Sequence, residues 1–253
     1  MKKLFFLLLF LPVGVLAHPG IALVKDSKGN IYYSDLTQVW KITNGKKTIV
    51  VSGVHTHELY IDNKDNLYGE HVSYSGEATD KYYHYLWRLK PGNILDTIFD
   101  KTQAYLFDDY SLARDKAGFE YYLKLKDSLH IYKKSPDGKE SVFSSGNFNG
   151  VSWLHPQKDG SLLYVLRNSV FRIKKGGEIS TIATNIASKP TFSISENNKT
   201  PWGVWENDSG NVYVAVLSDQ VVKKISANGS ISIYYTSPDN WTPLHGVFDN
   251  NGQ

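Results

Sequence analysis

The sequence predicts an all-β protein, a β-propeller of six blades in which the sixth blade is incomplete. Three observations lead to this fold class. One strand–turn–strand phrase recurs along most of the chain, and the composition, with 17 Tyr and 6 Trp, favours pleated sheets. No segment combines sustained helical periodicity with helix caps. A propeller follows because each repeat supplies one small antiparallel sheet that buries its faces against its neighbours.

Each copy of the repeat has a short apolar strand, a turn of Asp, Asn, Lys or Gly, a Tyr-rich strand, and later a basic strand. The first copy comprises residues 18–23, the turn 26–30, and the strands 31–33 and 39–42. Turn positions of successive copies are separated by 36, 53, 42, 50 and 42 residues, at Gly29, Asp65, Gly118, Gly160, Gly210 and Gly252. These spacings fit one four-stranded blade per repeat.

Further turns are expected between the third and fourth strands of the blades, at residues 91–93, 136–138, 175–177 and 227–229. They contain Gly and Asn, which tolerate the positive φ of tight hairpin turns. An insertion, residues 75–85, is expected to lengthen one loop of the second blade. The sixth copy begins at Gly246 and stops after its first turn, so we expect the chain to lack the C-terminal part of the propeller.

The N-terminus has the charged, apolar and small-residue order of a signal peptide over residues 1–17. The apolar run 4–16 is shorter than the roughly 20 residues that span a bilayer, so no membrane insertion is expected. Residues 18–253 are therefore predicted to form a single propeller domain that is periplasmic or secreted.

The composition excludes several classes of function. The chain contains no cysteine, which excludes disulfides and Cys-based zinc sites. Without Lys2 and Lys3, 26 basic residues face 25 acidic residues, a balance that offers no electrostatic attraction to nucleic acid. The expected partners are therefore small molecules, carbohydrates or peptides.

The densest group of chemically reactive side chains is His55, His57, Glu58, Glu70 and His71. Alternate residues of a strand share a face, so a strand here would place both histidines of the first segment together, and a hairpin would bring the second segment beside it. Imidazole and carboxylate suit both a divalent metal and acid–base chemistry. We predict catalytic roles for His57, Glu58, Glu70 and His71, with His57 and His71 as ligands of a divalent metal; the alternative is a set of solvated rim residues.

A second set of residues is predicted to bind a ligand: His55, Tyr74, Trp202 and His245. Trp202 and His245 stand at the entry positions of their blades, where they would surround the channel mouth together with Pro19 and His57. An aromatic ring with imidazoles suits a sugar or a peptide. The alternative is that the tryptophan fills the channel. His155, which precedes a proline, is expected to be structural or to face solvent.

Two phrases, residues 20–35 and 203–214, resemble the NHL repeat and the related SMP-30/gluconolactonase-like repeat. The resemblance implies a six-bladed propeller that binds ligands at one mouth of its channel, an architecture that hosts many functions. Enzymes resembling gluconolactonase hold a divalent metal with an acidic residue on the first inner strand. The corresponding residues here, 18–21, include no acid.

Three functions follow from these observations. The first is an exported propeller that binds a small polar ligand, carbohydrate or peptide, at the channel mouth. The second is a metal-dependent hydrolase or lyase acting on a sugar lactone or uronide, and the third is a non-catalytic protein-interaction scaffold. Loss of turnover in His57→Ala or His71→Ala would favour the enzyme, whereas sensitivity to Trp202→Ala would favour the sugar binder.

Overall fold

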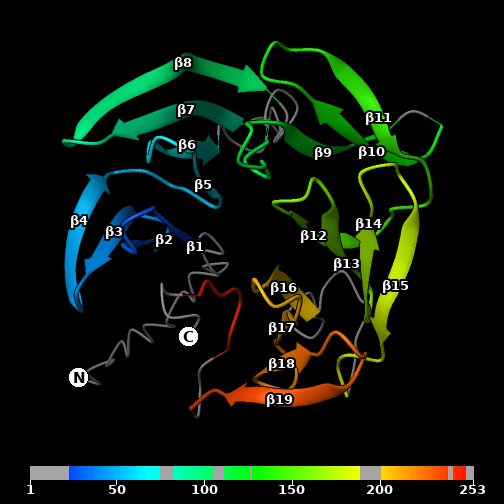
Figure 1. Cartoon of the computed structure of the whole chain (residues 1–253). Helices are drawn as coiled ribbons and strands as arrows, with labels where there is room; N and C mark the ends of the chain where they lie inside the picture. The colour runs from blue at the N-terminus through cyan, green and yellow to red at the C-terminus, as the bar shows by residue number, and fades with distance from the viewer. Residues whose placement is uncertain are drawn as a thin grey trace, which may run out of the picture.

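The computed structural model describes residues 23–74, 82–104, 111–125, 127–188, 201–238 and 242–248. The expected signal peptide, 1–17, and Pro19 lie outside these ranges. All regular elements within them are strands, and five antiparallel sheets are arranged around a central axis, as Figure 1 shows. The all-β propeller is confirmed. The described part of the chain contains no helix that is long and apolar enough to cross a membrane.

In each sheet the strands follow in chain order from the inside of the propeller to the outside. The first sheet contains β1 (Leu23–Lys25), β2 (Ile31–Ser34), β3 (Gln38–Thr43) and β4 (Lys46–Ser52). The second contains β5 (Leu59–Ile61), β6 (Leu67–Tyr74), β7 (Tyr82–Lys90) and β8 (Ile94–Ala104). The third contains β9 (Glu120–Leu125), β10 (Leu129–Lys134) and β11 (Glu140–Ser144). The fourth contains β12 (Val151–Pro156), β13 (Leu162–Leu166), β14 (Ser169–Ile173) and β15 (Ile179–Thr184). The fifth contains β16 (Pro201–Glu206), β17 (Val212–Val216), β18 (Val221–Ile225) and β19 (Ile231–Thr236).

The third sheet has three strands, and an irregular segment takes the inner position. Arg114 forms an isolated antiparallel bridge with Glu120. The N–H of Tyr121 donates to the carbonyl of Ala113 at 2.9 Å. Residues 111–115 therefore stand where the other blades have their innermost strand.

The recurring Asp or Asn of the repeat organises the first turn of its blade. The Asp26 carboxylate accepts hydrogen bonds from the backbone N–H of Lys28 at 3.0 Å and of Asn30 at 2.8 Å, and from the Tyr32 hydroxyl at 3.1 Å. Burial opposes ionisation of Asp26, but these bonds and one from the Asn30 side chain hold its pKa below its usual value. The Tyr-rich strand of the repeat is thereby tied to the turn that precedes it.

The core lies between neighbouring sheets rather than inside any one of them. Between the first and second sheets pack Val39, Leu67 and Trp87, each at most 1% exposed. Val204 and Val214 belong to the cluster between the fourth and fifth sheets and are fully buried. Because apolar side chains on both faces of a sheet are covered, the blades must stack around the axis to be stable.

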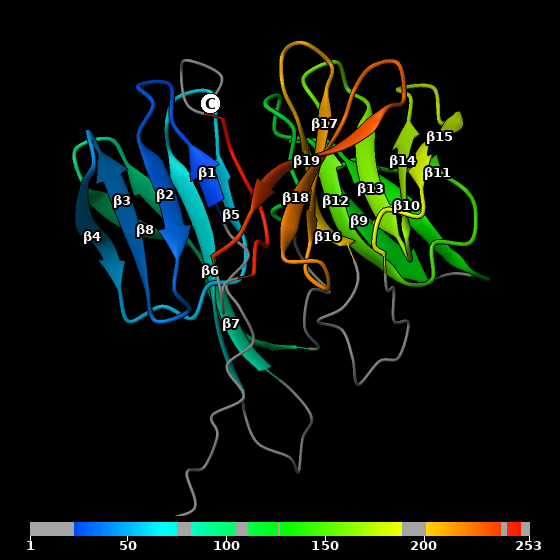
Figure 2. The ribbon, with the colours of Figure 1, turned by 90° about the horizontal axis from the view of Figure 1, so that it is seen from below.

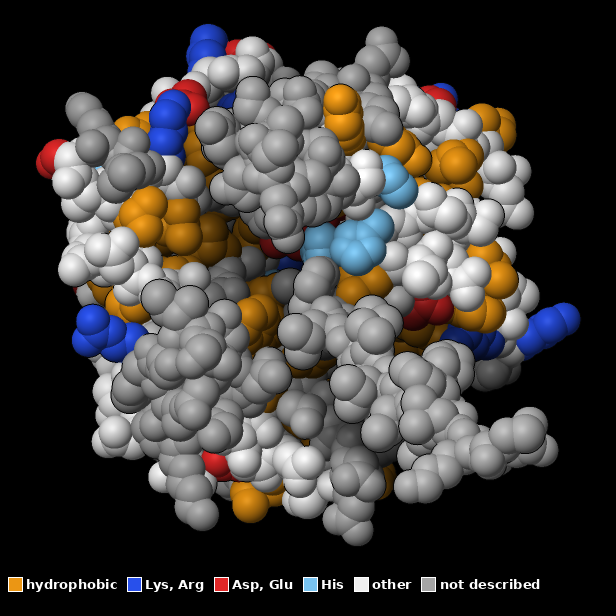
Figure 3. Space-filling view, turned by 180° about the vertical axis from the view of Figure 1, so that it is seen from behind, with side chains coloured by type: hydrophobic (Ala, Val, Ile, Leu, Met, Phe, Trp, Pro, Cys, Tyr) orange, Lys and Arg blue, Asp and Glu red, His pale blue; other side chains and the backbone are white. Residues whose placement is uncertain are grey.

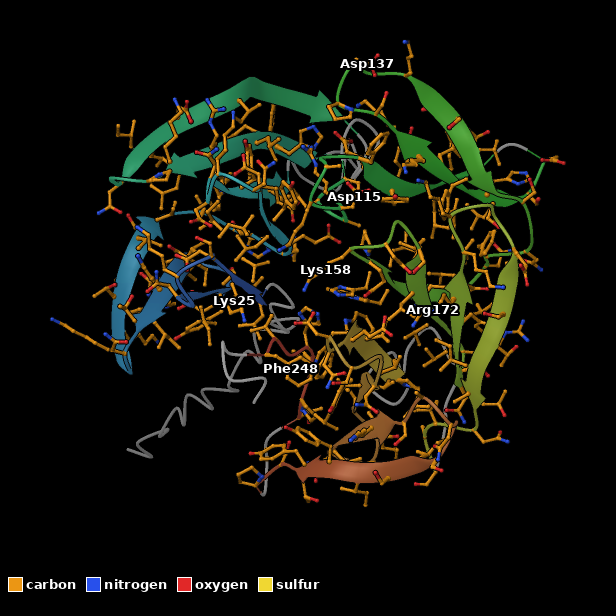
Figure 4. The ribbon with its side chains drawn as sticks, viewed as in Figure 1. Lys25, Asp115, Asp137, Lys158, Arg172 and Phe248 are labelled. Atoms are coloured by element: carbon orange, nitrogen blue, oxygen red, sulfur yellow. The ribbon has the colours of Figure 1, made fainter. Side chains whose placement is uncertain are left out.

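Residues 242–248 run along the inner strand of the fifth sheet. The N–H of Gly203 donates to the carbonyl of Leu244 at 3.1 Å, and the ring centroids of Phe248 and Tyr213 lie 4.7 Å apart. Figures 1 and 2 place this segment between the first and fifth sheets, and Figure 4 labels Phe248 there. It stands where the inner strand of a sixth blade would be, so the structure is compatible with six blades, and that number stays a prediction.

The predicted turns and the predicted insertion have different outcomes. Residues 91–93, 136–138, 175–177 and 227–229 all connect the two outer strands of their sheets, as predicted. The predicted loop over residues 75–85 extends too far, because Tyr82 to Tyr85 belong to β7 and pair with β6. His84 is consequently fully buried. Residues 75–81 lie outside the described ranges.

Candidate functional site

The segment that precedes β5 holds two histidines but is not a strand. β5 begins only at Leu59, so the expected strand over residues 55–58 is wrong. Other bonds fix this segment against β6. The N–H of Val72 donates to the carbonyl of His55 at 3.1 Å, and the Thr56 hydroxyl donates to the carbonyl of Glu70 at 2.6 Å. The two predicted segments are therefore adjacent, although the ladder between them is irregular.

Glu70 is the centre of the site and is fully buried. Its Oε1 accepts the backbone N–H of His57 at 3.0 Å and that of Glu58 at 3.3 Å. Its carbonyl accepts the indole N–H of Trp87 at 3.0 Å. The indole also covers Gly69, where an added Cβ would lie 2.1 Å from the ring. Glu70 is thus fixed on both its side chain and its backbone.

His57 and His55 follow one another beside this carboxylate. His57 Nδ1 lies 3.4 Å from Glu70 Oε1, and its Nε2 lies 3.1 Å from Nε2 of His55. With a proton on Nδ1 facing the carboxylate, a neutral His57 presents the lone pair of Nε2 to His55. The arrangement is that of a base oriented by a carboxylate.

The backbone holds the neutral His71 ring in one tautomer. Its Nδ1 accepts the N–H of His55 at 3.1 Å, and its ring stacks on Tyr85 with centroids 4.9 Å apart. A ring nitrogen that accepts a hydrogen bond has no proton, so the neutral imidazole must have its proton on Nε2. His71 is therefore a hydrogen-bond donor with a fixed ring orientation.

Glu58 completes the group with a second carboxyl. Burial, and then the charge of Glu70, raise the pKa of Glu58 to about 8, while a hydrogen bond with the Leu112 backbone lowers it less strongly. Leu112 belongs to the inner segment of the third blade, so the site spans two blades. Glu58 therefore retains its proton at neutral pH, the state that a general acid needs.

The structure thus brings together the five residues predicted from this hairpin: His55, His57, Glu58, Glu70 and His71. Figure 3 shows histidine side chains gathered beside a hollow near the centre of one face. The side chain of Tyr74 lies outside the described residues. Among the described residues, no group of three or more His, Asp or Glu side chains is arranged to hold a metal ion, so the metal roles of His57 and His71 stay predictions.

Another predicted ligand-binding residue, His245, lies in a second group, where it is surrounded by rings. The His245 ring centroid is 5.1 Å from Trp153, 5.5 Å from Trp205 and 5.8 Å from His155. Trp202 belongs to the same inner strand as Trp205. Trp153, His155 and Trp205 were not among the predicted site residues; the signal available in the sequence was that both 153–155 and 202–205 carry aromatic rings on an entry strand.

His155, expected to be structural or to face solvent, is partly exposed and packs edge-on against His245, which agrees with a structural role. Burial lowers the pKa of His155 to about 4. Burial, and then the neighbouring His155, lower the pKa of His245 to about 3. Both imidazoles are therefore neutral over the physiological range.

No protein-family model and no curated protein matches the chain. Among solved structures, a gluconolactonase from Xanthomonas campestris is similar with a TM-score of 0.62 and 13% identity, over 93% of this chain and 80% of that one. The calcium-binding protein regucalcin from Agrobacterium tumefaciens has a TM-score of 0.58 and 12% identity, over 92% and 78%. A virginiamycin B lyase from Staphylococcus aureus has a TM-score of 0.51 and 15% identity, over 89% and 72%.

At these identities the similarity establishes the fold. The chain has a β-propeller fold of the kind found in gluconolactonase, regucalcin and virginiamycin B lyase. The NHL label expected from the repeat is not confirmed, whereas the likeness to SMP-30/gluconolactonase propellers is supported at the level of structure.

Proposed function

We propose that the protein is an enzyme that binds a small polar ligand at the His–Glu group and acts on it by proton transfer, as a hydrolase or lyase. The main support is the neighbouring pair Glu58 and Glu70: the Glu58 carboxyl holds its proton at neutral pH, and His57 Nδ1 lies 3.4 Å from the fully buried Glu70 carboxyl. An acid and a base are thus present together at neutral pH. Perturbed ionisable groups of this kind cluster at catalytic sites.

In this proposal each side chain has one role. His57, beside Glu70, removes a proton from the attacking water or from a carbon of the substrate, which takes the place of His55 at Nε2 of His57. Glu58 donates its proton to the oxygen that leaves, and His71 donates a hydrogen bond from Nε2 to a substrate oxygen. Hydrolysis of a lactone and elimination from a uronide both balance with one proton removed and one returned.

The similar structures support this class of reaction. They include a gluconolactonase and a virginiamycin B lyase, and one of the lyase structures is a catalytically inactive histidine-to-alanine variant with quinupristin. The expected signal peptide supports a periplasmic or secreted location for the activity. The fold alone does not select a substrate, so sugar lactones, uronides and quinupristin are all reasonable compounds to test.

The proposal is tested by turnover of these compounds with the full chain and with Glu58→Gln and His57→Gln. Each variant should lose about 10²- to 10⁴-fold in kcat/KM, the usual contribution of acid–base catalysis. Activity should also fall as the pH rises above about 8, where Glu58 loses its proton. The matched controls are Glu178→Gln, on an exposed turn of the fourth blade, and His130→Gln, on β10 of the third blade, where the imidazole bonds Asp127.

A chelator distinguishes the metal-dependent version of the enzyme. Turnover that EDTA abolishes and a divalent metal restores would establish the metal roles predicted for His57 and His71. Full activity in Glu58→Gln and His57→Gln would contradict the proposal. Saturable binding without turnover, lost in the same variants, would favour the non-catalytic ligand-binding propeller instead.

A further inference from the structure

A groove lies along the β3–β4 hairpin of the first sheet and reaches the β7–β8 turn of the second. Its volume is about 590 Å³, the size of a small-molecule site. The lining includes Lys41, Asn44, Lys46 and Asn93, with Ile49 and Val50 as aliphatic walls. Figure 1 shows β4 at the outside of the propeller. The groove therefore lies at the rim, whereas the His–Glu group lies beside the inner strand β5.

Two lysines line this groove from the same face of the β3–β4 hairpin. In the register of the two strands, Lys41 is opposite Thr48. Lys46 is opposite Thr43, two positions closer to the turn, so the two lysines are diagonal neighbours. Diagonal neighbours on one face of a sheet lie about 7–8 Å apart, within reach of long side chains. The two ammonium groups can therefore meet on one ligand.

Among the residues that the structure describes, no carboxylate neutralises these lysines. The sequence has no acidic residue over 36–57, which includes both strands of the hairpin. Neither Lys41 nor Lys46 forms an ion pair within the described ranges, although Lys41 is half-buried. The Asp96 carboxylate of β8 already accepts two cations of its own sheet. Two like charges are thus neighbours on one face, an unfavourable pairing that a bound anion would offset.

Lys47 shows that the lack of a partner is particular to the groove. Its side chain lies on the opposite face of β4, where its ammonium is 3.8 Å from the ring centroid of Trp40 and 5.0 Å from that of Tyr33. Such contacts between a cation and aromatic faces are attractive. Lys47 therefore interacts within its own sheet, whereas the preceding residue, Lys46, is exposed in the groove.

The lining indicates the kind of ligand. Lysine ammonium groups and the side-chain amides of Asn44 and Asn93 supply hydrogen-bond donors. A phosphate monoester has nearly two negative charges above its second pKa of about 6, which matches the two lysines. A sulfate ester or a carboxylate has a single charge and would neutralise only one of them.

We propose that this groove binds a phosphate monoester, with Lys41 and Lys46 on the phosphoryl oxygens and the aliphatic walls against its organic group. The proposed reaction uses none of these residues, so the inference goes beyond that function, and binding here can be measured without turnover. The phosphoryl group can belong to a soluble ester or to a lipid headgroup, and the test separates the two sources.

The test is a titration of the full chain with phenyl phosphate, followed by saturation-transfer NMR of the phenyl protons and by calorimetry at physiological salt. Lys46→Gln should weaken binding about 3- to 5-fold, the effect of one exposed ion pair. Lys41→Gln should weaken it about 5- to 10-fold, because this lysine is half-buried. Lys47→Gln, a matched loss of charge on the other face of β4, should leave binding close to that of the wild type.

The charge of the ester gives two further readouts. Binding should strengthen as the pH rises through about 6, where the phosphate takes its second negative charge. Phenyl sulfate, which has one charge and the same ring, should bind about 5-fold more weakly than phenyl phosphate at neutral pH, as expected for one lost ion pair. Vesicles of phosphatidylcholine with and without phosphatidic acid test the lipid source.

Binding to the phosphatidic acid vesicles alone, lost in Lys46→Gln, would support the site and assign the phosphate to a lipid headgroup. Three outcomes would overturn the site: no binding of phenyl phosphate or of vesicles to the folded wild type, equal weakening by Lys46→Gln and Lys47→Gln, or equal affinity for phenyl sulfate. Thermal unfolding checks that each variant is folded; should Lys41→Gln fail to fold, Lys46→Gln still decides. Glu58→Gln should bind the ester normally, so failure of the proposed reaction and failure of the groove are distinguishable.

Discussion

Three partly buried ionisable side chains have perturbed pKa values, and these perturbations affect stability in opposite directions. Glu58 binds a proton more tightly in the folded chain than in the unfolded chain, whereas His155 and His245 bind one less tightly. The stability of the wild type therefore combines opposite pH slopes. Single-residue variants separate these two pH slopes.

Glu58→Gln should stabilise the protein near neutral pH. The unfolded carboxyl ionises above about pH 4.5 and the folded one only near pH 8, so the free energy of unfolding falls as the pH rises through this window. A neutral amide removes that loss, and we expect a gain of about 2 kcal/mol at pH 7. Urea unfolding measures it, with Glu178→Gln as the exposed control. Equal stability of Glu58→Gln and wild type would show that Glu58 is ionised in the folded chain.

His245→Gln should change the acid side of the stability curve. Below its ordinary pKa the unfolded imidazole takes up a proton that the folded ring, packed against Trp153, Trp205 and His155, accepts only near pH 3. The free energy of unfolding of the wild type therefore loses this contribution as the pH falls from about 6.5. As the pH falls from about 7.5 to about 5, the free energy of unfolding of the variant should rise by about 1 kcal/mol relative to that of the wild type. Parallel unfolding curves over this range would contradict the prediction.

The sequence predicts the His–Glu group better than the group of rings around His245, for a physical reason. His55, His57, Glu58, Glu70 and His71 belong to one hairpin, so local pairing is enough to bring them together. His155 and His245 lie 90 residues apart in the sequence and meet only because residues 242–248 cross beside β16. Contacts between blades depend on how the ring of sheets closes, which no local pattern encodes.

At the scale of elements, the first turns of the first, second, third and fifth blades are built on the same hydrogen bonds. The Asp62 carboxylate accepts the backbone N–H groups of Lys64 and Asn66 at 2.8 and 2.9 Å and the Tyr68 hydroxyl at 3.0 Å. In the fifth blade Asn207 takes the same position and accepts the N–H groups of Ser209 and Asn211. An amide oxygen can therefore replace the carboxylate in this turn.

Asp62→Ala should destabilise the protein, and Asp62→Asn should do so much less. Alanine leaves the two turn N–H groups and the tyrosine hydroxyl without their acceptor, which should cost about 2 kcal/mol. Asparagine keeps the acceptor but loses the charge, and we expect less than half of that cost. Chemical unfolding at neutral pH measures both variants. Equal losses would mean that the charge of Asp62, rather than the geometry of its oxygens, stabilises the turn.

The same elements show where local patterns fail. The repeat predicts the turns because Asp, Asn and Gly have fixed roles in them. It does not predict that residues 82–85 extend β7, since a Tyr- and His-rich stretch resembles a polar loop as much as a strand. Nor does it predict that residues 55–58 are irregular, because side-chain bonds to Glu70 replace the ladder there.

At the scale of the whole molecule, the first and fifth sheets each present aromatic side chains on faces that no described sheet covers. Tyr234 and Tyr235 on β19 are each 50% exposed, and Tyr234 packs edge-on against Tyr213. On the first sheet, Tyr33 stacks on Trp40. Residues 242–248 lie between these two sheets and cover part of the fifth, where Phe248 meets Tyr213. This segment therefore covers the fifth sheet on the side that faces the first, and it is where closure of the ring can be tested.

Gly246→Ala tests that closure. A Cβ at Gly246 would lie 2.4 Å from the indole of Trp205, a bulky ring that packs in the core of the fifth sheet. The segment must then move away from β16, and we expect a loss of about 1–3 kcal/mol, as for other overpacked sites. Amide hydrogen exchange over 242–248 should become faster in the variant.

Gly176→Ala is the matched control, because no atom lies within 4 Å of its added Cβ. It should leave both stability and exchange as in the wild type. If Gly246→Ala exchanges no faster than this control over 242–248, the segment is not held against Trp205. Some other part of the protein would then have to fill the sixth-blade position, and His245 would not be held against Trp153, Trp205 and His155.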